Sequence, residues 1–542
     1  MTVLRRIDLI VTGSGAVAGW PLGQVRHCAA AVSAGAIATL LDDVKRGPAD
    51  GVLLWDPALG APDPELANEL LGRVADVHHG GLSLGQASRP AAIHFIEPVW
   101  MHNCDPPPDR ASTSWRVSFR ACLIRRSVLE QMDGPCAEFH DSEAAALELG
   151  FRWLRRGVFV RHEPRLAGAE VRPPRAPLDV HDELLFAQRG FGASWSMWAA
   201  ARGSLTGTWS RAETARLATR RLAEAAPRQT FVRAPTPAQR RGDERVTVLV
   251  PTIERYPYLR VLLEQLRHQT VAPHEIIVID QTPAADRDAS FTRDYSDLPL
   301  RWITLDQAGQ CSSRNAGLKA STGDHILFVD DDDEVKPTLI QLHLEALARY
   351  DSDASCGIAH EVGIPTMPEN FTITRASDVF PTNNTMVRRS LLERTGLFDL
   401  AFDRQPRADG DLGMRAHLSG AFMVLNPEID VLHHHAPRGG LRKHGARVIT
   451  YASSRGSLWQ RHLPAPSEIY LAARYFGDIA VREVLWQRSL GTLSSHGDRW
   501  RRLAKGTTGA LMLPNTMERM RQIHASARQM IAREPQIPQL TP

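Results

Sequence analysis

The chain has 542 residues, a formal net charge of +3 at pH 7, and the hydrophobic and charged fractions of an ordinary soluble protein, 43% and 23%. This length allows two to four domains, and so small a net charge gives no argument for a nucleic-acid partner. Six scattered cysteines with no CxxC pair indicate a reducing compartment and argue against a disulfide framework and a zinc site. Because no signal peptide opens the chain and no apolar segment reaches bilayer length, we expect a cytoplasmic protein.

The first residues indicate a βαβ unit. A strand is predicted over 7–13, a helix from about Gln24 to Leu41, and a second strand over 51–56 that ends in Asp56. Glycines 13, 15 and 19 have the spacing GxGxxxG, with no clearly placed ribose-binding acid, which favours a tight turn over a dinucleotide site.

Two features of this first half return later at one offset. Residues 124–130 (IRRSVLE) parallel residues 387–393 (VRRSLLE), and Arg152 and Arg415 each precede a glycine by five residues. The offset is 263 in both cases (388 − 125 and 415 − 152). A shared offset predicts a duplicated domain, and chance similarity between common helix residues is the alternative.

A second α/β domain follows residues 226–244, which are rich in Pro, Arg, Gln and Ala and are predicted to be a linker. Its first strands are predicted at 246–250 and 275–280, and the second ends in Asp280. Ligands gather at the carboxyl ends of strands in open α/β sheets, so Asp280 is expected on a binding rim, with a turn or cap role as the alternative.

Five consecutive acids, 330–334, follow the apolar strand predicted at 326–329. Like charges this close repel one another, so a divalent cation such as Mg²⁺ or Mn²⁺ is expected among them. The alternative is a solvated acidic turn before a helix. Arg314 follows a Gly- and Ser-rich turn and presents a fork suited to phosphate, although a surface arginine on a helix is the default interpretation.

Two further candidates lie downstream. Asp409 opens a predicted helix, where it can serve as a general base, as an N-cap, or as both. His433 and His435 would share one face of an extended segment, and either imidazole could join carboxylates around Mn²⁺.

The last part of the chain, 450–542, is predicted to be helical and basic, with Trp459, Trp486 and Trp500 among many arginines. Such helices can lie on an anionic membrane surface, and the alternative is packing on the preceding domain or on a partner subunit. The Pro-rich tail from Glu534 is predicted to be disordered.

From Val246 to about Gly445 the sequence resembles glycosyltransferase family 2, which has the GT-A fold. Five motifs stand in the family's order: residues 250–255 (VPTIER), 275–280 (EIIVID), 313–317 (SRNAG), 323–332 (GDHILFVDDD) and 409–415 (DGDLGMR). The resemblance implies an α/β fold of tandem GT-A domains, the Rossmann-like fold of nucleotide-diphospho-sugar transferases, plus a helical C-terminal region. The implied parts are a degenerate GT-A-like domain (1–225), the linker (226–244), a catalytic domain (245–449) and the helical region (450–542).

The resemblance also assigns roles. Asp409 matches the family's catalytic base, and Asp332 of the DxD motif and His433 would hold Mn²⁺ or Mg²⁺. The residues expected around the donor are Thr252, Glu254, Arg255, Asp280, Arg314, Asp330 and Asp331.

The sequence departs from the family's pattern in two places. Ala408 stands where the family often has Glu before the base, and Gln281-Thr282-Pro283 follow Asp280, which leaves the choice among UDP, GDP and dTDP sugars open. In the first half, the 263 offset places Ala146 at the position of Asp409, and no DxD follows Asp56, so this copy is expected to lack catalysis.

The function implied is metal-dependent, inverting transfer of a sugar from a nucleotide-sugar donor to a hydroxyl of a glycan or glycolipid, as in polysaccharide biosynthesis. One alternative is a non-catalytic glycan-binding or scaffold protein of tandem GT-A-like domains. Another is a nucleotidyltransferase, which shares the need for metal and nucleotide.

Overall fold

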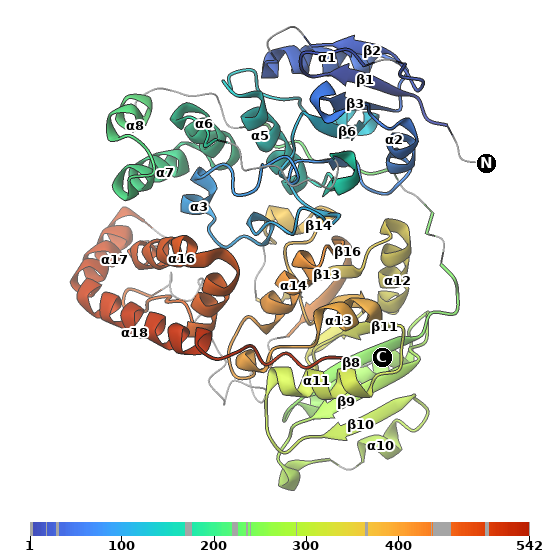
Figure 1. Ribbon diagram of the computed structural model, residues 1–542. Coiled ribbons are helices and arrows are strands. Elements are labelled where there is room, and N and C mark those ends of the chain that lie inside the picture. Colours follow the sequence, from blue (N-terminus) through green and yellow to red (C-terminus); the bar gives the residue numbers. More distant parts are fainter. Residues whose placement is uncertain are drawn as a thin grey trace.

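The computed structural model describes residues 4–17, 19–28, 32–167, 176–218, 226–234, 237–238, 240–288, 290–363, 367–434, 436, 457–493 and 498–540. It contains two mixed β-sheets flanked by helices, and a helical C-terminal region beside them (Figure 1). The predicted fold class, α/β with a helical C-terminal region, is thereby confirmed.

The first half contains a seven-stranded sheet in the order β2-β1-β3-β6-β4-β7-β5. Its strands are β1 (Ile7–Val11), β2 (Val25–His27), β3 (Gly51–Trp55), β4 (Val77–His79), β5 (Ser112–Thr113), β6 (Ala121–Arg125) and β7 (Val160–His162). Its helices are α1 (Ala34–Arg46), α2 (Pro64–Leu71), α3 (Ala92–Ile96), α4 (Arg126–Gln131), α5 (Ser142–Arg155), α6 (Val180–Phe191), α7 (Ala193–Thr206) and α8 (Arg211–Ala218).

The helix predicted from about Gln24 to Leu41 begins later in the structure than the sequence predicted. Val25–His27 instead pairs with β1 as the edge strand β2, and α1 begins at Ala34, where the Ser33 side chain accepts a hydrogen bond from the Ala36 N–H. A serine N-cap satisfies one of the unpaired N–H groups of the first turn, which fixes the helix start there.

The second half contains a nine-stranded sheet in the order β10-β9-β8-β11-β15-β13-β16-β12, with β14 also paired to β16. Its strands are β8 (Val246–Thr252), β9 (Glu275–Asp280), β10 (Leu300–Thr304), β11 (His325–Phe328), β12 (Asp333–Val335), β13 (Ala354–Glu361), β14 (Arg375–Ala376), β15 (Thr385–Arg388) and β16 (Met423–His433). Its helices are α9 (Tyr256–Arg267), α10 (Phe291–Asp294), α11 (Gln310–Ala320), α12 (Leu339–Tyr350), α13 (Arg389–Thr395) and α14 (Ala408–Leu418).

The two sheets share one topology. The order β2-β1-β3-β6-β4-β7-β5 matches β9-β8-β11-β15-β13-β16-β14, and each pair of neighbours is parallel or antiparallel in the same way in both sheets. Arg125 and Arg388, which are related by the 263 offset, each pair with the first residue of the equivalent strand, Gly51 in one sheet and His325 in the other; these two partners are 274 residues apart (325 − 51). This agreement over a whole sheet is more than chance similarity between two short helices would produce.

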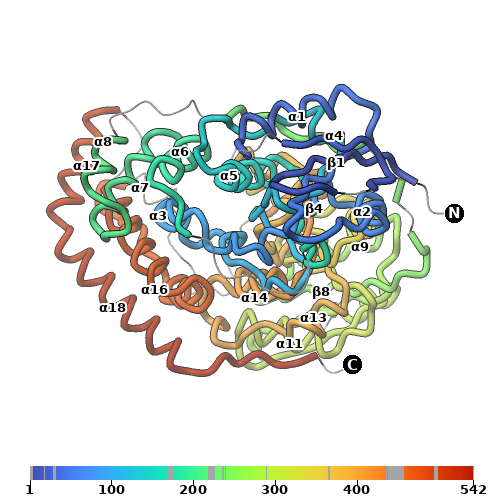
Figure 2. Tube along the Cα trace, turned by 45° about the horizontal axis from the view of Figure 1, so that its top comes forward, coloured from blue at the N-terminus to red at the C-terminus, as the bar shows by residue number. Residues whose placement is uncertain are grey.

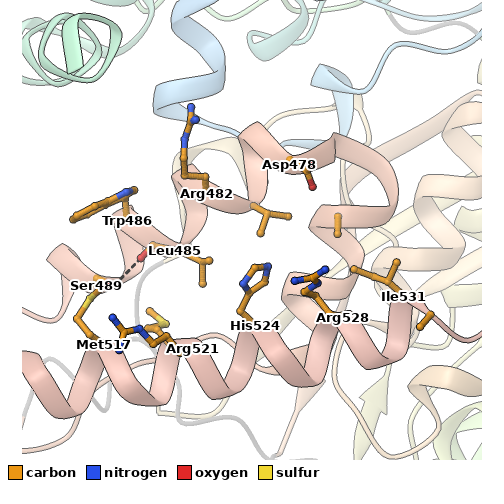
Figure 3. A pocket seen from close by; sticks show the side chains of 14 residues that line it. Asp478, Arg482, Leu485, Trp486, Ser489, Met517, Arg521, His524, Arg528 and Ile531 are labelled. Carbon is orange, nitrogen blue, oxygen red and sulfur yellow. Dashed lines mark hydrogen bonds between the residues drawn. The ribbon is translucent and has the colours of Figure 1, made fainter. Parts of the chain in front are cut away.

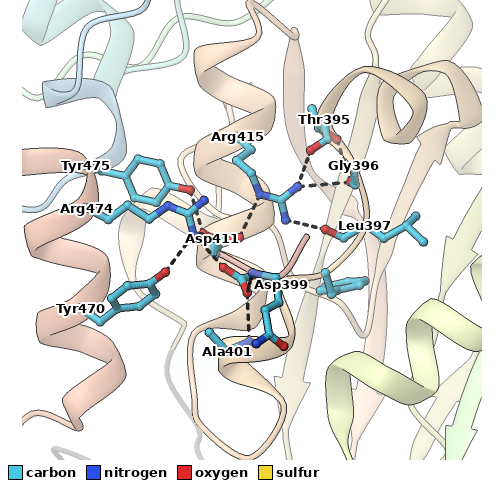
Figure 4. A network of polar contacts seen from close by, with 12 residues as sticks. Thr395, Gly396, Leu397, Asp399, Ala401, Asp411, Arg415, Tyr470, Arg474 and Tyr475 are labelled. Carbon is cyan, nitrogen blue, oxygen red and sulfur yellow. Dashed lines mark hydrogen bonds and ion pairs between the residues drawn. The ribbon is translucent and has the colours of Figure 1, made fainter. Parts of the chain in front are cut away.

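A buried ion network also occurs in both halves. In the second half, Arg415 of α14 lies 2.9 Å from Asp411 and donates to the carbonyls of residues 395–397 (Figure 4). In the first half, Arg152 of α5 lies 2.9 Å from Glu148 and donates to the carbonyls of residues 133 and 134, the positions equivalent to 396 and 397.

An arginine from a later helix completes each network. Arg189 of α6 lies 3.2 Å from Glu148, and Arg474 of α16 (Pro466–Gly491) lies 3.0 Å from Asp411. The likeness of the two halves therefore extends from the sheets to the helix that follows the last shared strands.

The C-terminal region contains α16, α17 (Arg499–Leu511) and α18 (Leu513–Ile531), and α16 is interrupted by non-helical geometry at Gly477. α16 packs against α14 and α3, so it is in contact with both halves. A cavity of about 830 Å³ opens between α16 and α18, lined by Leu485, Trp486 and Arg521 among others (Figure 3). Among the described residues, none of the helices combines the length and the apolarity needed to cross a membrane.

The tail differs from the predicted disorder. Residues 536–540 return to the second half, where the Gln536 and Pro538 carbonyls accept hydrogen bonds from the N–H groups of Leu400 and Leu397. Leu540 is buried in that core, and the C-terminus lies beside α13 and α11 (Figure 2). Backbone pairing and one buried leucine give the tail contacts that its composition alone does not predict.

The predicted linker also has contacts of its own. Phe231 is buried and its N–H donates to the Arg156 carbonyl, and Arg233 pairs with Asp76 of the first half. The two halves touch directly as well, through the Trp100 indole N–H, 2.6 Å from Asp378, and through the His417 ring, 2.9 Å from the Cys104 carbonyl.

Candidate functional site

The candidate site is built on three parallel strands whose carboxyl ends meet at one edge of the second sheet. β8 pairs with both β9 and β11, and Thr252 at the end of β8 is directly opposite Asp280 at the end of β9. The acidic run starts two residues after β11 ends at Phe328. The strand order therefore brings Thr252, Asp280 and the acidic run to one rim, as predicted.

Asp331 is the buried centre of this rim. Its carboxylate accepts a hydrogen bond from the Thr252 hydroxyl at 2.7 Å and pairs with Arg255 at 3.0 Å. Burial raises the pKa of Asp331 to about 7, against the lowering effect of Arg255. The side chains predicted around the donor are therefore linked to one another, with Arg255 as the cation between two acids.

Asp332 has an unusual environment. Its Oδ2 accepts the Ala436 N–H at 2.7 Å, whereas its buried Oδ1 lies 3.0 Å from Arg255 and 3.8 Å from His433 but accepts no hydrogen bond of acceptable geometry. A buried carboxylate oxygen without a hydrogen bond is costly unless a cation binds it. Carboxylate oxygens suit Mg²⁺ or Mn²⁺, and an imidazole can join them around Mn²⁺, so the residues present fit a divalent cation.

His433 reaches this site because β12 and β16 are antiparallel neighbours in which Asp333 is directly opposite His433. The His433 Nδ1 lies 2.8 Å from the Asp333 carboxylate. The neighbouring acids, Asp333 first, raise the pKa of His433 to about 9 against the effect of burial, and burial raises the pKa of Asp333 to about 7. His435, the other imidazole considered, lies outside the described residues.

Asp333 is a site residue that the sequence analysis did not select. The acidic run placed it in the cluster, but its contact with His433 depends on strand pairing across 100 residues of chain, which no local pattern reveals. Asp333 also accepts the Asp330 N–H at 3.0 Å, so it holds the acidic turn in shape.

The remaining donor candidates line the same rim. Arg314 on α11 pairs with Asp330 at 2.8 Å. Asp280 accepts the Tyr256 hydroxyl at 2.7 Å and the Thr282 N–H at 2.9 Å. Glu254 has a positive φ of 56° and donates its N–H to the Thr282 hydroxyl at 3.0 Å, so this residue shapes the loop after β8.

Asp409 lies in the first turn of α14, where the positive end of the helix favours an anion. It is partly exposed, and within the described part of the chain its carboxylate has no hydrogen-bond or ion-pair partner; Arg407 is near enough to interact electrostatically. The preceding loop is tied to the start of α11, because Asp403 accepts the N–H groups of Cys311 and Ser312. Asp409 is thus linked to the helix that carries Arg314.

The second acid of this motif, Asp411, is fully buried and occupied. It is held by Arg415 at 2.9 Å, by Arg474 at 3.0 Å and by the Tyr475 hydroxyl at 2.7 Å (Figure 4). Arg474 also pairs with Asp399 at 2.8 Å. Of the two acids, Asp411 is buried in these contacts, whereas Asp409 is partly exposed.

At the equivalent positions, the first half keeps one acid, Asp56, and has Pro57, Ala58 and Ala146 in place of Asp331, Asp332 and Asp409. Asp56, which follows β3 as Asp330 follows β11, pairs with Arg120 at 2.6 Å and caps its own turn by accepting the Ala58 N–H. Ala146 is buried within α5. Asp141 and Glu143, the nearby acids, are an N-cap and a buried acceptor of the Phe119 N–H.

Comparisons with known proteins identify relatives of the second half. Residues 247–402 match the family described as Glycosyl transferase family 2. The uncharacterized glycosyltransferase YwdF of Bacillus subtilis is 30% identical over 168 residues, 29% of this chain and 62% of that protein. The uncharacterized glycosyltransferase EpsJ of the same organism is 34% identical over 116 residues, 21% of this chain and 33% of that protein. The matches thus span less than two thirds of each relative.

Two solved structures are distantly similar. S. aureus TarS 1-349 in complex with UDP-GlcNAc is 15% identical with a TM-score of 0.33. The aligned region covers 51% of this chain and 92% of the TarS chain. The mannosyltransferase PcManGT from Pyrobaculum calidifontis, in complex with GDP-Man and Mn²⁺, is 16% identical with a TM-score of 0.35, and covers 55% and 89%. TM-scores this low support no inference about the present chain. The sequence match confirms the predicted resemblance to glycosyltransferase family 2 over residues 247–402.

Proposed function

We propose that the second half catalyses metal-dependent, inverting transfer of a sugar from a nucleotide-sugar donor to a hydroxyl acceptor. The observation that carries this proposal is the pairing of two features on one domain. One is an acidic rim in which the buried Asp332 Oδ1 lies 3.0 Å from Arg255 and 3.8 Å from His433 and, among the described residues, accepts no hydrogen bond of acceptable geometry. The other is Asp409 at a helix start, whose carboxylate has no hydrogen-bond or ion-pair partner in the described part of the chain.

In the reaction, Asp409 accepts the proton of the acceptor hydroxyl while the oxygen of that hydroxyl forms a bond to the anomeric carbon of the donor sugar. The bond from that carbon to the diphosphate oxygen breaks on the opposite face, so the configuration inverts. Asp332 and His433, with Asp333 orienting the imidazole, would hold a Mn²⁺ or Mg²⁺ ion, which supplies charge neutralisation for the leaving nucleoside diphosphate.

The donor is positioned by the rest of the rim. Asp280, oriented by Tyr256, is placed for the ribose or base, and Thr252, Glu254 and Arg255 line the nucleotide side. Arg314, with Asp330 and Asp331, steadies the donor phosphates. Holding donor and acceptor in line supplies a large part of the rate in such reactions.

We propose that residues 1–225 are a degenerate copy of the catalytic domain (245–449), joined to it by residues 226–244. The shared sheet topology and the repeated Arg–acid network support this origin. With Ala146 in place of the base and Asp56 neutralised by Arg120, this copy would support the fold or bind acceptor rather than catalyse.

The acceptor is proposed to be a glycan or glycolipid, and the protein to act in the cytoplasm. For residues 450–542, packing of α16 on α14 is observed, and a peripheral contact with the inner face of a membrane is proposed in addition. Its support is three exposed indoles, Trp459, Trp486 and Trp500, which expose 65%, 42% and 68% of their surface among arginines.

The test is a thermal-shift screen of UDP, GDP and dTDP sugars with and without Mn²⁺, because a ligand that binds only the native state raises the midpoint. A shift that requires both Mn²⁺ and one nucleotide class, and disappears in Asp332→Ala, supports the donor site. Asp409→Asn should keep this shift but release no nucleoside diphosphate with acceptor present. Release of pyrophosphate would instead support a nucleotidyltransferase, and no shift with any nucleotide a scaffold.

A further inference from the structure

A second group of metal-ligand side chains lies in the first half, apart from the acidic rim. His140 stands immediately before Asp141, the N-cap of α5, and Asp179, His181 and Asp182 form the N-cap and first turn of α6. One ligand atom from each of the four lies within 4.8 Å of the others. We propose that these four residues bind a Zn²⁺-like transition-metal ion that joins the starts of α5 and α6.

The side chains already converge on one point. The His140 Nδ1 lies 2.9 Å from Asp179, and the His181 Nδ1 lies 3.1 Å from Asp182. The two imidazole rings are parallel, 4.0 Å apart at an interplanar angle of 9°. Two imidazoles and two carboxylates from two elements are therefore gathered at one place, with a ligand atom of each within 4.8 Å of the others.

Asp182 fixes the loop that carries His140. Its fully buried carboxylate accepts the His140 N–H at 2.9 Å and the Asp141 N–H at 2.8 Å. A carboxylate has about four acceptor positions, so two backbone hydrogen bonds leave capacity for a metal. The backbone of His140 is thus held in position whether or not an ion is present.

The ligand chemistry selects the class of ion. Imidazole nitrogen with carboxylate oxygen suits Zn²⁺, Co²⁺ or Ni²⁺, whereas Ca²⁺ and Mg²⁺ prefer sites made of oxygen alone. The scattered cysteines predicted no zinc site, but this group is made of histidines and aspartates and contains no cysteine. His140 and Asp179 are exposed, so an ion can enter from solvent.

The second half shows that the fold does not require this group. There, the starts of α14 and α16 are joined by an ordinary ion pair, Arg407 to Glu468 at 2.8 Å. The first half has two histidines and two aspartates at the comparable junction of α5 and α6. A metal-binding role explains why a simple ion pair is replaced by four side chains with ligand atoms.

The experiment uses the full chain with Asp332→Asn, so that the acidic rim contributes little, and titrates Zn²⁺ by calorimetry and Co²⁺ by visible absorption. One ion per chain should bind, with the visible bands of Co²⁺ coordinated by nitrogen and oxygen. His140→Gln and His181→Gln, which keep the size of the side chain, should each weaken binding by at least the tenfold to hundredfold that loss of an outer-shell partner typically costs. His268→Gln is the matched control, because His268 is exposed and pairs with Glu264 at 3.1 Å.

Three results would overturn the site. They are no saturable binding of either ion, unchanged affinity in both His140→Gln and His181→Gln, or an equal loss in His268→Gln. Circular dichroism of each variant checks that the chain is folded. Because nucleotide binding is measured separately in the chain with Asp332 intact, failure of this proposal leaves the proposed glycosyl transfer untouched, and the reverse also holds.

Discussion

Arg474 connects the C-terminal region to the helix that carries Asp409, and Arg474→Met should loosen that connection. Its guanidinium lies 2.8 Å from Asp399 and 3.0 Å from Asp411, and both carboxylates are fully buried. Removing one partner of a buried ion pair costs about 3–5 kcal/mol. Asp411 keeps Arg415 and the Tyr475 hydroxyl, so we expect the lower limit, about 3 kcal/mol of unfolding free energy.

This loss should be visible in both stability and catalysis. For a domain of this size, 1 kcal/mol corresponds to about 2–4 °C in Tm, so the midpoint should fall by about 6–12 °C. At a temperature where the variant is folded, kcat should fall because α14 and Asp409 are less firmly placed. The donor-dependent thermal shift should persist, because Asp331 and Asp332 are held by Thr252 and Arg255 instead.

The control is Arg519→Met on α18, because this arginine is exposed and the substitution is the same as in Arg474→Met. Its Tm and kcat should equal those of the parent chain. If Arg474→Met shifts Tm by no more than Arg519→Met does, the network does not join the C-terminal region to α14. If donor affinity falls as far as kcat, α14 is not the element affected.

Three further predictions concern other sites. Tyr256→Phe removes the hydroxyl that orients Asp280 at 2.7 Å, so KM for the donor should rise several-fold with kcat little changed in steady-state assays. Burial lowers the pKa of His343 to about 4, so the contribution of the neutral ring to stability is full above pH 6.5 and is lost as the pH falls toward 4. In that pH window, His343→Gln should reduce the dependence of the unfolding free energy on pH by about 1.4 kcal/mol per pH unit. Urea unfolding at a series of pH values measures this slope. Ala146→Asp should lower Tm and add no activity, since it buries a charge in α5; gain of transfer would contradict the degenerate copy.

The rim was predictable because each of its residues lies at or just after the carboxyl end of a strand. Thr252, Asp280 and the acidic run each follow an apolar strand, and parallel neighbours bring such ends together. The role of Asp333 was not predictable, because its partner His433 is 100 residues away and is positioned only by the pairing of β12 with β16. The edge strand β2 and the packed tail were missed for a related reason: short segments acquire their structure from a distant neighbour.

The repeated network also decides between the two acids of the Asp409–Asp411 motif. Glu148, Arg152 and Arg189 reproduce the contacts of Asp411, Arg415 and Arg474 in a half where Ala146 replaces the candidate base. A network present with and without that base serves the packing of two helices, not the reaction. Loss of activity on changing Asp411 would therefore report on the position of α14, whereas substitution of Asp409, which has no hydrogen bond or ion pair with the described residues, addresses proton transfer.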